Sequence, residues 1–358
     1  MPRAFARSSL ADAVARLRPG MKVLLPPGSG EPGALVAEIC RQSERLRDLT
    51  LLGGIHLGDY PFARPEHAAL RFATWHMSPR LDDAHRRGRV EFVPMRYFDL
   101  VEHFAAGGAW APDCVLVHCA PPDARGYLSL GVSVSVALPA ARRAPLVIAQ
   151  VNPSMPRTLG NGFLHRSQID CFVEVDEPLA SYPPPTIGEV ERAIGRHVAE
   201  GMGTRRLFTF LHENPLVNME PSGFVHDPAI VAQIDRFVAI NSALEIDLTG
   251  QVTAESLGPR QVAGIGGQFD FVLGASRSRG GAAIVALPST GRDGAVSRIV
   301  PRLSAGAAVT NPRALADWIV TEHGAAGLRG KGERGRAEAL IAVAHPRFRE
   351  ELLQRATS

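Results

Sequence analysis

The feature that most limits the possible folds is an alternation of short apolar runs with longer amphipathic runs in the first half of the chain. Runs typical of buried strands lie at residues 21–25, 49–55, 90–93, 115–118, 146–151 and 170–175. Helices are predicted at residues 33–45, 97–105 and 187–200. This alternation predicts an α/β domain with a mainly parallel sheet, because parallel neighbours need a long crossover between them.

The length of 358 residues exceeds that of a usual single domain, so two domains are expected. A Pro-rich stretch at residues 182–186 and the helix predicted after it mark the boundary, which divides the chain into residues 1–199 and 200–358. In the second half, strands are predicted at residues 238–248 and 283–287. Helices are predicted at residues 228–235, 313–319, 333–343 and 347–355.

The stretch 238–248 alternates with a period of two, as a half-buried strand does. One face carries the large apolar residues Val238, Ile240, Leu244, Ile246 and Leu248. The other is small and polar and includes Asn241 and Glu245. We expect the first face to pack on a core and Glu245 to lie on the open face. The ordinary alternative is that this glutamate pairs with an arginine.

A glycine-rich segment follows, with Gly264, Gly266 and Gly267 within four positions and Gln268 directly after them. Such a segment lets the backbone approach a ligand and directs several N–H groups to one point. A carboxylate beside such donors suits acyl chemistry, in which the carboxylate attacks a thioester and the N–H groups hold the oxyanion. Asn241 is predicted to orient Glu245, and Asp270 to fix the loop.

Several motifs together resemble the acetyl-CoA hydrolase/transferase family, and within it the 4-hydroxybutyrate and butyrate CoA-transferase branch. The segments that carry the resemblance are Asn241-Ser-Ala-Leu-Glu-Ile-Asp-Leu-Thr-Gly-Gln-Val-Thr, Gly264-Ile-Gly-Gly-Gln-Phe-Asp-Phe, Pro121-Pro-Asp-Ala-Arg-Gly-Tyr-Leu-Ser-Leu-Gly, Val151-Asn-Pro-Ser-Met-Pro-Arg-Thr-Leu-Gly, Ala286-Leu-Pro-Ser-Thr, Val320-Thr-Glu-His-Gly and Ala344-His-Pro-Arg-Phe. The resemblance implies two CoA-transferase-like α/β domains that meet at a cleft, with Glu245 becoming a glutamyl-CoA thioester during transfer.

One departure from the family pattern concerns the start of the second domain. The family carries a Gly-rich strand–loop–helix unit and a further strand before the equivalent of Met202-Gly-Thr-Arg-Arg. Here Val198-Ala-Glu runs almost directly into Gly201. The second sheet is therefore expected to be shortened, which leaves an unpaired edge and favours a homo-oligomer, most simply a dimer.

Composition excludes several other functions. The formal net charge of +3 is too small to indicate a nucleic-acid or membrane partner, and no run reaches the length of a membrane span. The four cysteines have no metal-ligand spacing and are predicted to be buried free thiols in a reducing cytoplasm. The twelve histidines form no metal motif, and His323 and His345 are predicted to be structural.

A glycine pattern from Gly28 to Gly33 fits the dinucleotide fingerprint in its strand–turn–helix setting. The next strand, however, is followed by His56 and not by the acidic residue that would hold the ribose. A glycine loop at a helix N-terminus is the better interpretation. The basic residues Arg329, Lys331, Arg334 and Arg336 are more simply a solvated surface run.

The sequence therefore predicts an acyl-CoA:carboxylate CoA-transferase that works through Glu245 and needs no cofactor beyond coenzyme A as a substrate. Its partners are acyl-CoA and a small carboxylate acceptor. Two alternatives stay open: an acyl-CoA hydrolase that uses the same glutamate, and a catalytically silent CoA-binding subunit.

Overall fold

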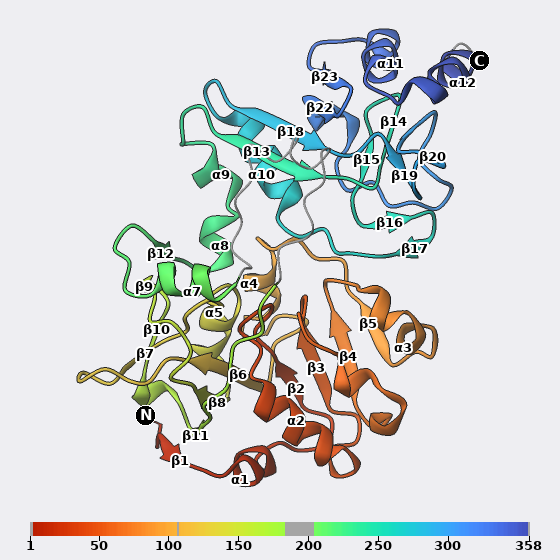
Figure 1. Cartoon of the computed structure of the whole chain (residues 1–358). Helices are drawn as coiled ribbons and strands as arrows, with labels where there is room; N and C mark the ends of the chain where they lie inside the picture. The colour runs from red at the N-terminus through yellow and green to blue at the C-terminus, as the bar shows by residue number, and fades with distance from the viewer. Residues whose placement is uncertain (1–2, 106, 183–203, 357–358) are drawn as a thin grey trace. The chain divides into compact units, whose positions relative to one another are not determined.

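The computed structural model of the chain describes residues 3–105, 107–182 and 204–356 (Figure 1). Within these residues, two compact units are found: residues 3–182 with 204–225, and residues 226–356. The predicted boundary near residue 200 and the predicted helix at residues 187–200 lie outside the described residues. No helix in the described part of the chain is long and apolar enough to cross a membrane.

The first unit is built on a sheet of eight strands, all parallel to their neighbours. Its order is β1 (Ala6–Arg7), β11 (Cys171–Glu174), β8 (Leu146–Val151), β6 (Cys114–Cys119), β2 (Lys22–Leu24), β3 (Thr50–Gly53), β4 (Arg71–Thr74) and β5 (Val90–Phe92). Strand β2 lies inside the sheet: β3, β4 and β5 follow it on one side, and β6, β8, β11 and β1 on the other. The predicted α/β domain with a parallel sheet is confirmed.

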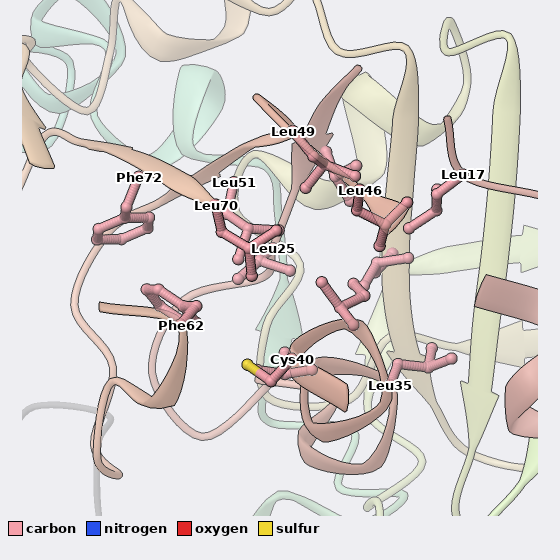
Figure 2. Close-up of a cluster of buried hydrophobic side chains, with 14 of the residues drawn as sticks. Leu17, Leu25, Leu35, Cys40, Leu46, Leu49, Leu51, Phe62, Leu70 and Phe72 are labelled. Carbon is pink, nitrogen blue, oxygen red and sulfur yellow. The ribbon is translucent and has the colours of Figure 1, made fainter. Parts of the chain in front are cut away.

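Both faces of this sheet are covered, because successive side chains of a strand point to opposite sides. In β6, Leu116 belongs to the core on one face, whereas Val115 and Val117 belong to the core on the other. The first core receives residues from α1 (Leu10–Ala15) and α2 (Gly33–Arg41). Figure 2 shows part of it, with Cys40 and Leu35 on opposite sides of α2 and Phe62 on the side of Cys40.

The remaining helices of the first unit are short. The second core receives residues from α4 (Leu100–His103) and α5 (Ala137–Ala141), while α3 (Asp82–Arg86) precedes β5. Residues 204–225 include α7 (Arg205–Leu211) and α8 (Ser222–Val225). They join this unit through β12 (Asn218–Met219), which pairs with β9 (Leu159–Gly160). A further antiparallel pair is formed by β7 (Tyr127–Ser129) and β10 (Phe163–His165).

The second unit contains a smaller mixed sheet. Its order is β13 (Val238–Ser242), β18 (Ala282–Ala286), β22 (Trp318–Thr321) and β23 (Gly324–Gly327), with only the last pair antiparallel. A separate sheet holds β15 (Val252–Thr253), β14 (Glu245–Asp247) and β21 (Ile299–Val300). Two small antiparallel pairs are β16 (Ser256–Leu257) with β17 (Arg260–Gln261) and β19 (Thr290–Gly291) with β20 (Val296–Ser297).

Helices cover this sheet as well. The crossover helix α10 (Gln268–Arg277) packs Val272 and Ala275 against Ala239 and Ala283, and α9 (Pro228–Val231) packs on α10. Another core of this second unit includes Val285 and Ile319 and receives residues from α11 (Glu333–Ala342) and α12 (Pro346–Ala356). The second domain is thus α/β, smaller than the first and mixed in strand direction.

The prediction of one continuous strand over residues 238–248 is wrong. The chain leaves one sheet after Ser242 and enters another at Glu245. In β13 the predicted faces are reversed: Ala239 is buried under α10, while Val238 is 49% exposed. Beyond the break, Ile246 and Leu248 are buried as expected. An alternation of apolar and polar residues predicts which side chains are buried only while the strand stays in one sheet. Because the chain changes sheets here, the alternation over residues 238–248 did not predict the buried face of β13.

Two other predictions need correction. The helix expected at residues 313–319 is a short 3-10 turn at Arg313–Leu315, followed by strand β22. Helix α10 and strand β4 were not predicted. The cysteine prediction is confirmed, because all four thiols are free and buried. Burial raises the pKa of Cys40 to about 12, so this thiol stays protonated and unreactive at neutral pH.

Candidate active site

Glu245 is the first residue of β14, where it pairs with Thr253 of β15, while the next residue, Ile246, pairs with Ile299 of β21. Its side chain is partly buried. Ser304, in the loop after β21, holds the carboxylate: its Oγ lies 2.9 Å from both carboxylate oxygens, and its backbone N–H donates to Oε2 at 3.2 Å. Among the described residues, the carboxylate is therefore oriented by the neutral donors of Ser304 and pairs with no arginine.

The turn after β14 fixes the strand that carries Glu245. The fully buried carboxylate of Asp247 accepts hydrogen bonds from the backbone N–H groups of Thr249 and Gln251 and from both of their side chains. Gly250 has a φ of +97°, which a residue with a side chain rarely adopts. The family-like segment Asp247-Leu-Thr-Gly-Gln is thus a turn closed by its own aspartate.

Glu255 connects this strand pair to the glycine loop (residues 264–267). Its backbone oxygen accepts from the N–H groups of Val262 and Ala263, directly before the loop. Its buried carboxylate accepts from Thr310 at 2.9 Å and from Gln261 at 3.0 Å. Glu255 lies two positions after Thr253, the strand partner of Glu245. The start of the glycine loop is therefore held by the same segment that pairs with Glu245.

The glycine loop leads into α10, with Gly267 as the N-cap residue. Gly266 has a φ of +61° and open space where a Cβ would lie. At Gly267 a Cβ would come within 2.2 Å of the His226 ring, so a side chain here would have to displace that ring. The first N–H groups of a helix have no carbonyl partner within the helix itself, so a helix start can offer backbone donors to a ligand.

Two buried amide groups near this helix have no acceptor in the described part of the chain. They are Nδ2 of Asn241, in β13, and Nε2 of Gln268, in the first turn of α10. The two elements pack against each other. Asp270, in the same turn, is fully buried. Buried N–H donors without acceptors are uncommon in folded proteins, so these two amides are available to a ligand oxygen or to water.

The structure thus sorts the predicted residues into two groups. Gln268, Asp270 and the glycine loop lie together at the start of α10, and Asn241 lies in the strand beneath that helix. Glu245 lies in a different sheet, and within the described residues its hydrogen bonds go to Ser304. Sequence analysis missed Ser304, which carries no motif; the only signal is its place just after the strand that pairs with β14.

In the first unit, the family-like motifs form a polar network at the carboxyl ends of β6 and β8. Asn152 donates from Nδ2 to the backbone oxygen of Glu177 and lies 3.1 Å from Nε2 of His118. Because an amide NH2 group only donates, Nε2 of His118 accepts and Nδ1 carries the proton. Nδ1 then donates to the backbone oxygen of Glu31 at 3.1 Å, which holds the Gly28–Gly33 loop.

Burial lowers the pKa of His118 to about 4, so the ring is neutral at physiological pH. Other motif residues make local contacts. Asp123 closes a turn by accepting from the N–H groups of Arg125 and Tyr127, and Arg157 pairs with it at 2.7 Å. His323 and His345 stack edge to face at 5.3 Å.

The two-unit α/β fold, the parallel sheet and the motifs now define the class of protein. The model of the acetyl-CoA hydrolase/transferase N-terminal domain matches residues 4–182, and that of the C-terminal domain matches residues 203–356. Together they span most of the chain, so the chain belongs to the acetyl-CoA hydrolase/transferase family.

Similar proteins include the 4-hydroxybutyrate coenzyme A transferase of Clostridium kluyveri, 34% identical over 95% of each chain. The succinyl-CoA:cyclohexane-1-carboxylate CoA transferase of Geobacter metallireducens is 32% identical and covers 97% of this chain and 94% of its own. Among solved structures, RipA from Yersinia pestis superposes with a TM-score of 0.91 at 27% identity, covering 98% of this chain and 97% of that one.

The alignment also measures what is missing. It runs over 407 positions, whereas 95% of 358 residues is about 340, so about 67 aligned positions have no residue here. The matched regions leave residues 183–202 between them. Taken together, about 67 positions are as many as a strand–loop–helix unit and a further strand would need.

The neutral state of His118 makes stability depend on pH. The unfolded histidine binds a proton near pH 6.5, but the folded one only near pH 4, so the stability from the neutral ring is present above pH 6.5 and is lost as the pH falls towards 4. Between about pH 7.5 and about pH 5 this loss is roughly 2 kcal/mol. In His118→Gln the fall in unfolding free energy over that interval should be smaller by this amount.

Urea unfolding at the two pH values measures the difference. The matched control is His103→Gln, which lies on α4 outside the network and should leave the wild-type difference unchanged. The assignment fails if His118→Gln loses as much stability between the two pH values as the wild type.

Proposed function

We propose that this protein is an acyl-CoA:carboxylate CoA-transferase in which Glu245 is the nucleophile. The observation that carries the proposal is the partly buried Glu245 carboxylate, held by Ser304 next to a turn that fixes its strand. Membership of the acetyl-CoA hydrolase/transferase family supplies the reaction class, and both named relatives are CoA transferases. Coenzyme A enters as a substrate, and we place the reaction in the cytoplasm.

The route has two half-reactions. A carboxylate oxygen of Glu245 attacks the thioester carbon, the CoA thiolate leaves, and a mixed anhydride forms. The thiolate then attacks the glutamyl carbonyl carbon, which releases the acyl group as a carboxylate and leaves a glutamyl-CoA thioester. An acceptor carboxylate reverses both steps. Oε2 accepts from the Ser304 N–H, and the single Ser304 hydroxyl proton is shared between the two oxygens, so Oε1 is the freer oxygen for attack.

The glycine loop and the buried amide groups are the candidates to hold the substrate oxyanion. Gly264, Gly266 and Gly267 supply backbone N–H groups, and Gln268 and Asn241 supply buried amides that lack acceptors among the described residues. One such donor contributes about 3 kcal/mol to lowering a barrier of this kind. Asp270 keeps the start of α10 in place and takes no part in the bond changes.

Glu245→Gln should abolish transfer, because an amide oxygen is a poor nucleophile, while the hydrogen bond from the Ser304 N–H survives. Glu245→Asp should also lose at least about a hundredfold, because it withdraws the carboxylate by about 1.5 Å. Transfer from an acyl-CoA to acetate, followed by chromatography of the CoA esters, measures both. Glu338→Gln, an exposed glutamate on α11, is the matched control.

The intermediate itself can be trapped. After incubation with an acyl-CoA and reduction by borohydride, the peptide that contains Glu245 should carry the mass change of a reduced thioester. Wild-type transfer with no change at Glu245, or an active Glu245→Asp variant, contradicts the assignment.

Two alternatives differ from this proposal in a measurable way. If the protein is a hydrolase, it should release free CoA from acyl-CoA when no acceptor carboxylate is present. The rate of that release should equal the rate of turnover measured with an acceptor. A silent CoA-binding subunit is favoured by a specific observation: the relatives carry about 67 positions that this chain lacks, and any reacting group among them is lost here. CoA binding by calorimetry, with neither turnover nor trapping, would establish that second candidate.

The glycine loop is best tested at Gly266, because a side chain at Gly267 would collide with His226. Gly266→Val has space but must adopt an unfavourable φ, which displaces the loop N–H groups. If those groups serve the transition state, turnover should fall by about tenfold to a thousandfold while the dissociation constant for CoA changes less. Equal losses in turnover and in CoA affinity would mean that the loop only holds the ligand.

A homodimer through the second unit also belongs to the proposal. In the described part of the chain, β13 has one strand neighbour, β18, so its other edge is open. Val238 on that strand is 49% exposed and Ile234 before it is 51% exposed. An open edge flanked by apolar side chains is unfavourable in water and pairs readily with a second copy.

Light scattering over a dilution series should therefore show a dimer. Val238→Lys should shift it towards monomer, because a charge on an edge strand opposes pairing. Val296→Lys, at a valine exposed by 39% in another sheet, is the control. A wild type that is monomeric at every concentration would contradict the dimer.

A further inference from the structure

A pocket of about 460 Å³ lies in the first unit, at the amino ends of β3, β4 and β5. Three successive loops that enter these strands each bring arginine to it: Arg47 before β3, Arg71 at the start of β4, and Arg87 with Arg89 before β5. The acidic residues in its lining are Glu44 and Asp48. With four arginines and two acidic residues, the lining carries a net positive charge.

The four guanidinium groups are not equally engaged. Arg89 is fixed, because it donates to the backbone oxygens of Ala63 at 2.8 Å and Arg64 at 3.1 Å. The side chain of Arg47 has no hydrogen bond or ion pair among the residues that the structure describes. Arg71 pairs with Asp48 at 3.1 Å, and Arg87 with Asp83 at 3.0 Å.

The two ion pairs can rearrange at little cost. The side chains of Arg71 and Arg87 are 59% and 61% exposed, and exposed ion pairs contribute only about 0–1 kcal/mol. The pocket therefore combines one guanidinium group held in a fixed place with three that can turn towards an anion. Planar guanidinium groups match the oxygens of phosphate, to which they bind in pairs.

We propose that this pocket binds a small molecule that carries phosphate groups, such as a diphosphate or a nucleotide. The volume lies in the range of pockets for small molecules, and the open, polar lining suits a highly charged ligand better than an apolar one. α/β proteins usually bind their substrates at the carboxyl ends of the sheet strands. This pocket lies at the other end of the sheet, beside the amino ends of β3, β4 and β5. Its ligand is therefore separate from the substrates of the proposed transfer reaction, and its test does not depend on that reaction.

Isothermal titration of the full chain with inorganic pyrophosphate, at about 0.15 M salt, tests the proposal. The double variant Arg47→Gln/Arg87→Gln removes two guanidinium groups that make no contact with the core, so folding should be unaffected, and thermal unfolding checks this. Arg125→Gln, at an exposed arginine in the Asp123 turn, is the matched control. We expect the double variant to bind pyrophosphate at least about tenfold more weakly, and the control to bind as the wild type does.

A parallel titration with CoA separates the two sources of phosphate. If the pocket is independent, the double variant keeps the wild-type affinity for CoA. A loss of CoA affinity by the same factor would show that the pocket holds the nucleotide of CoA and would overturn its independence. No pyrophosphate binding by the wild type at about 10 mM, or equal binding by the double variant, would overturn the proposal itself.

Discussion

The buried carboxylate of Asp247 determines where Glu245 can lie. It accepts four hydrogen bonds from the turn that follows and keeps β14 between β15 and β21. Loss of an acceptor at this depth would leave several buried donors without a partner, at about 1–3 kcal/mol each. The position of Glu245 therefore depends on a residue two places away that takes no part in the proposed chemistry.

The central strands of the first unit could be predicted because strands such as β6 and β8 stay in one sheet and are buried on both faces, whereas β4 was not found. The second unit could be predicted only in part. Between Ser242 and Glu245 the chain changes sheets, and nothing in the sequence marks this change, since both strands keep a period of two. Glu245 and the glycine loop could be found from their motif, whereas Ser304 could not, because its contact depends on how β21 pairs with β14.

The second unit has a strand edge that is unpaired among the described residues. That edge belongs to β13, on which Val238 is 49% exposed. The buried face of the same strand is still closed, because the small side chains of Ala239 and Ala283 let α10 pack closely. The core of the second unit is thus closed by α10 on this face, while β13 has one strand neighbour among the described residues.

The proposed route contains two oxyanions at different places, and one set of donors cannot hold both. The first forms on the substrate carbonyl when Glu245 attacks, and donors outside the glutamate must stabilise it. The second forms on the glutamyl oxygen when the CoA thiolate returns. The Ser304 donors already contact both oxygens of that carboxylate, so whichever oxygen becomes the carbonyl lies within their reach. Hydrogen bonds that fix the resting carboxylate thereby also stabilise its second intermediate, whereas the glycine loop is needed only for the first.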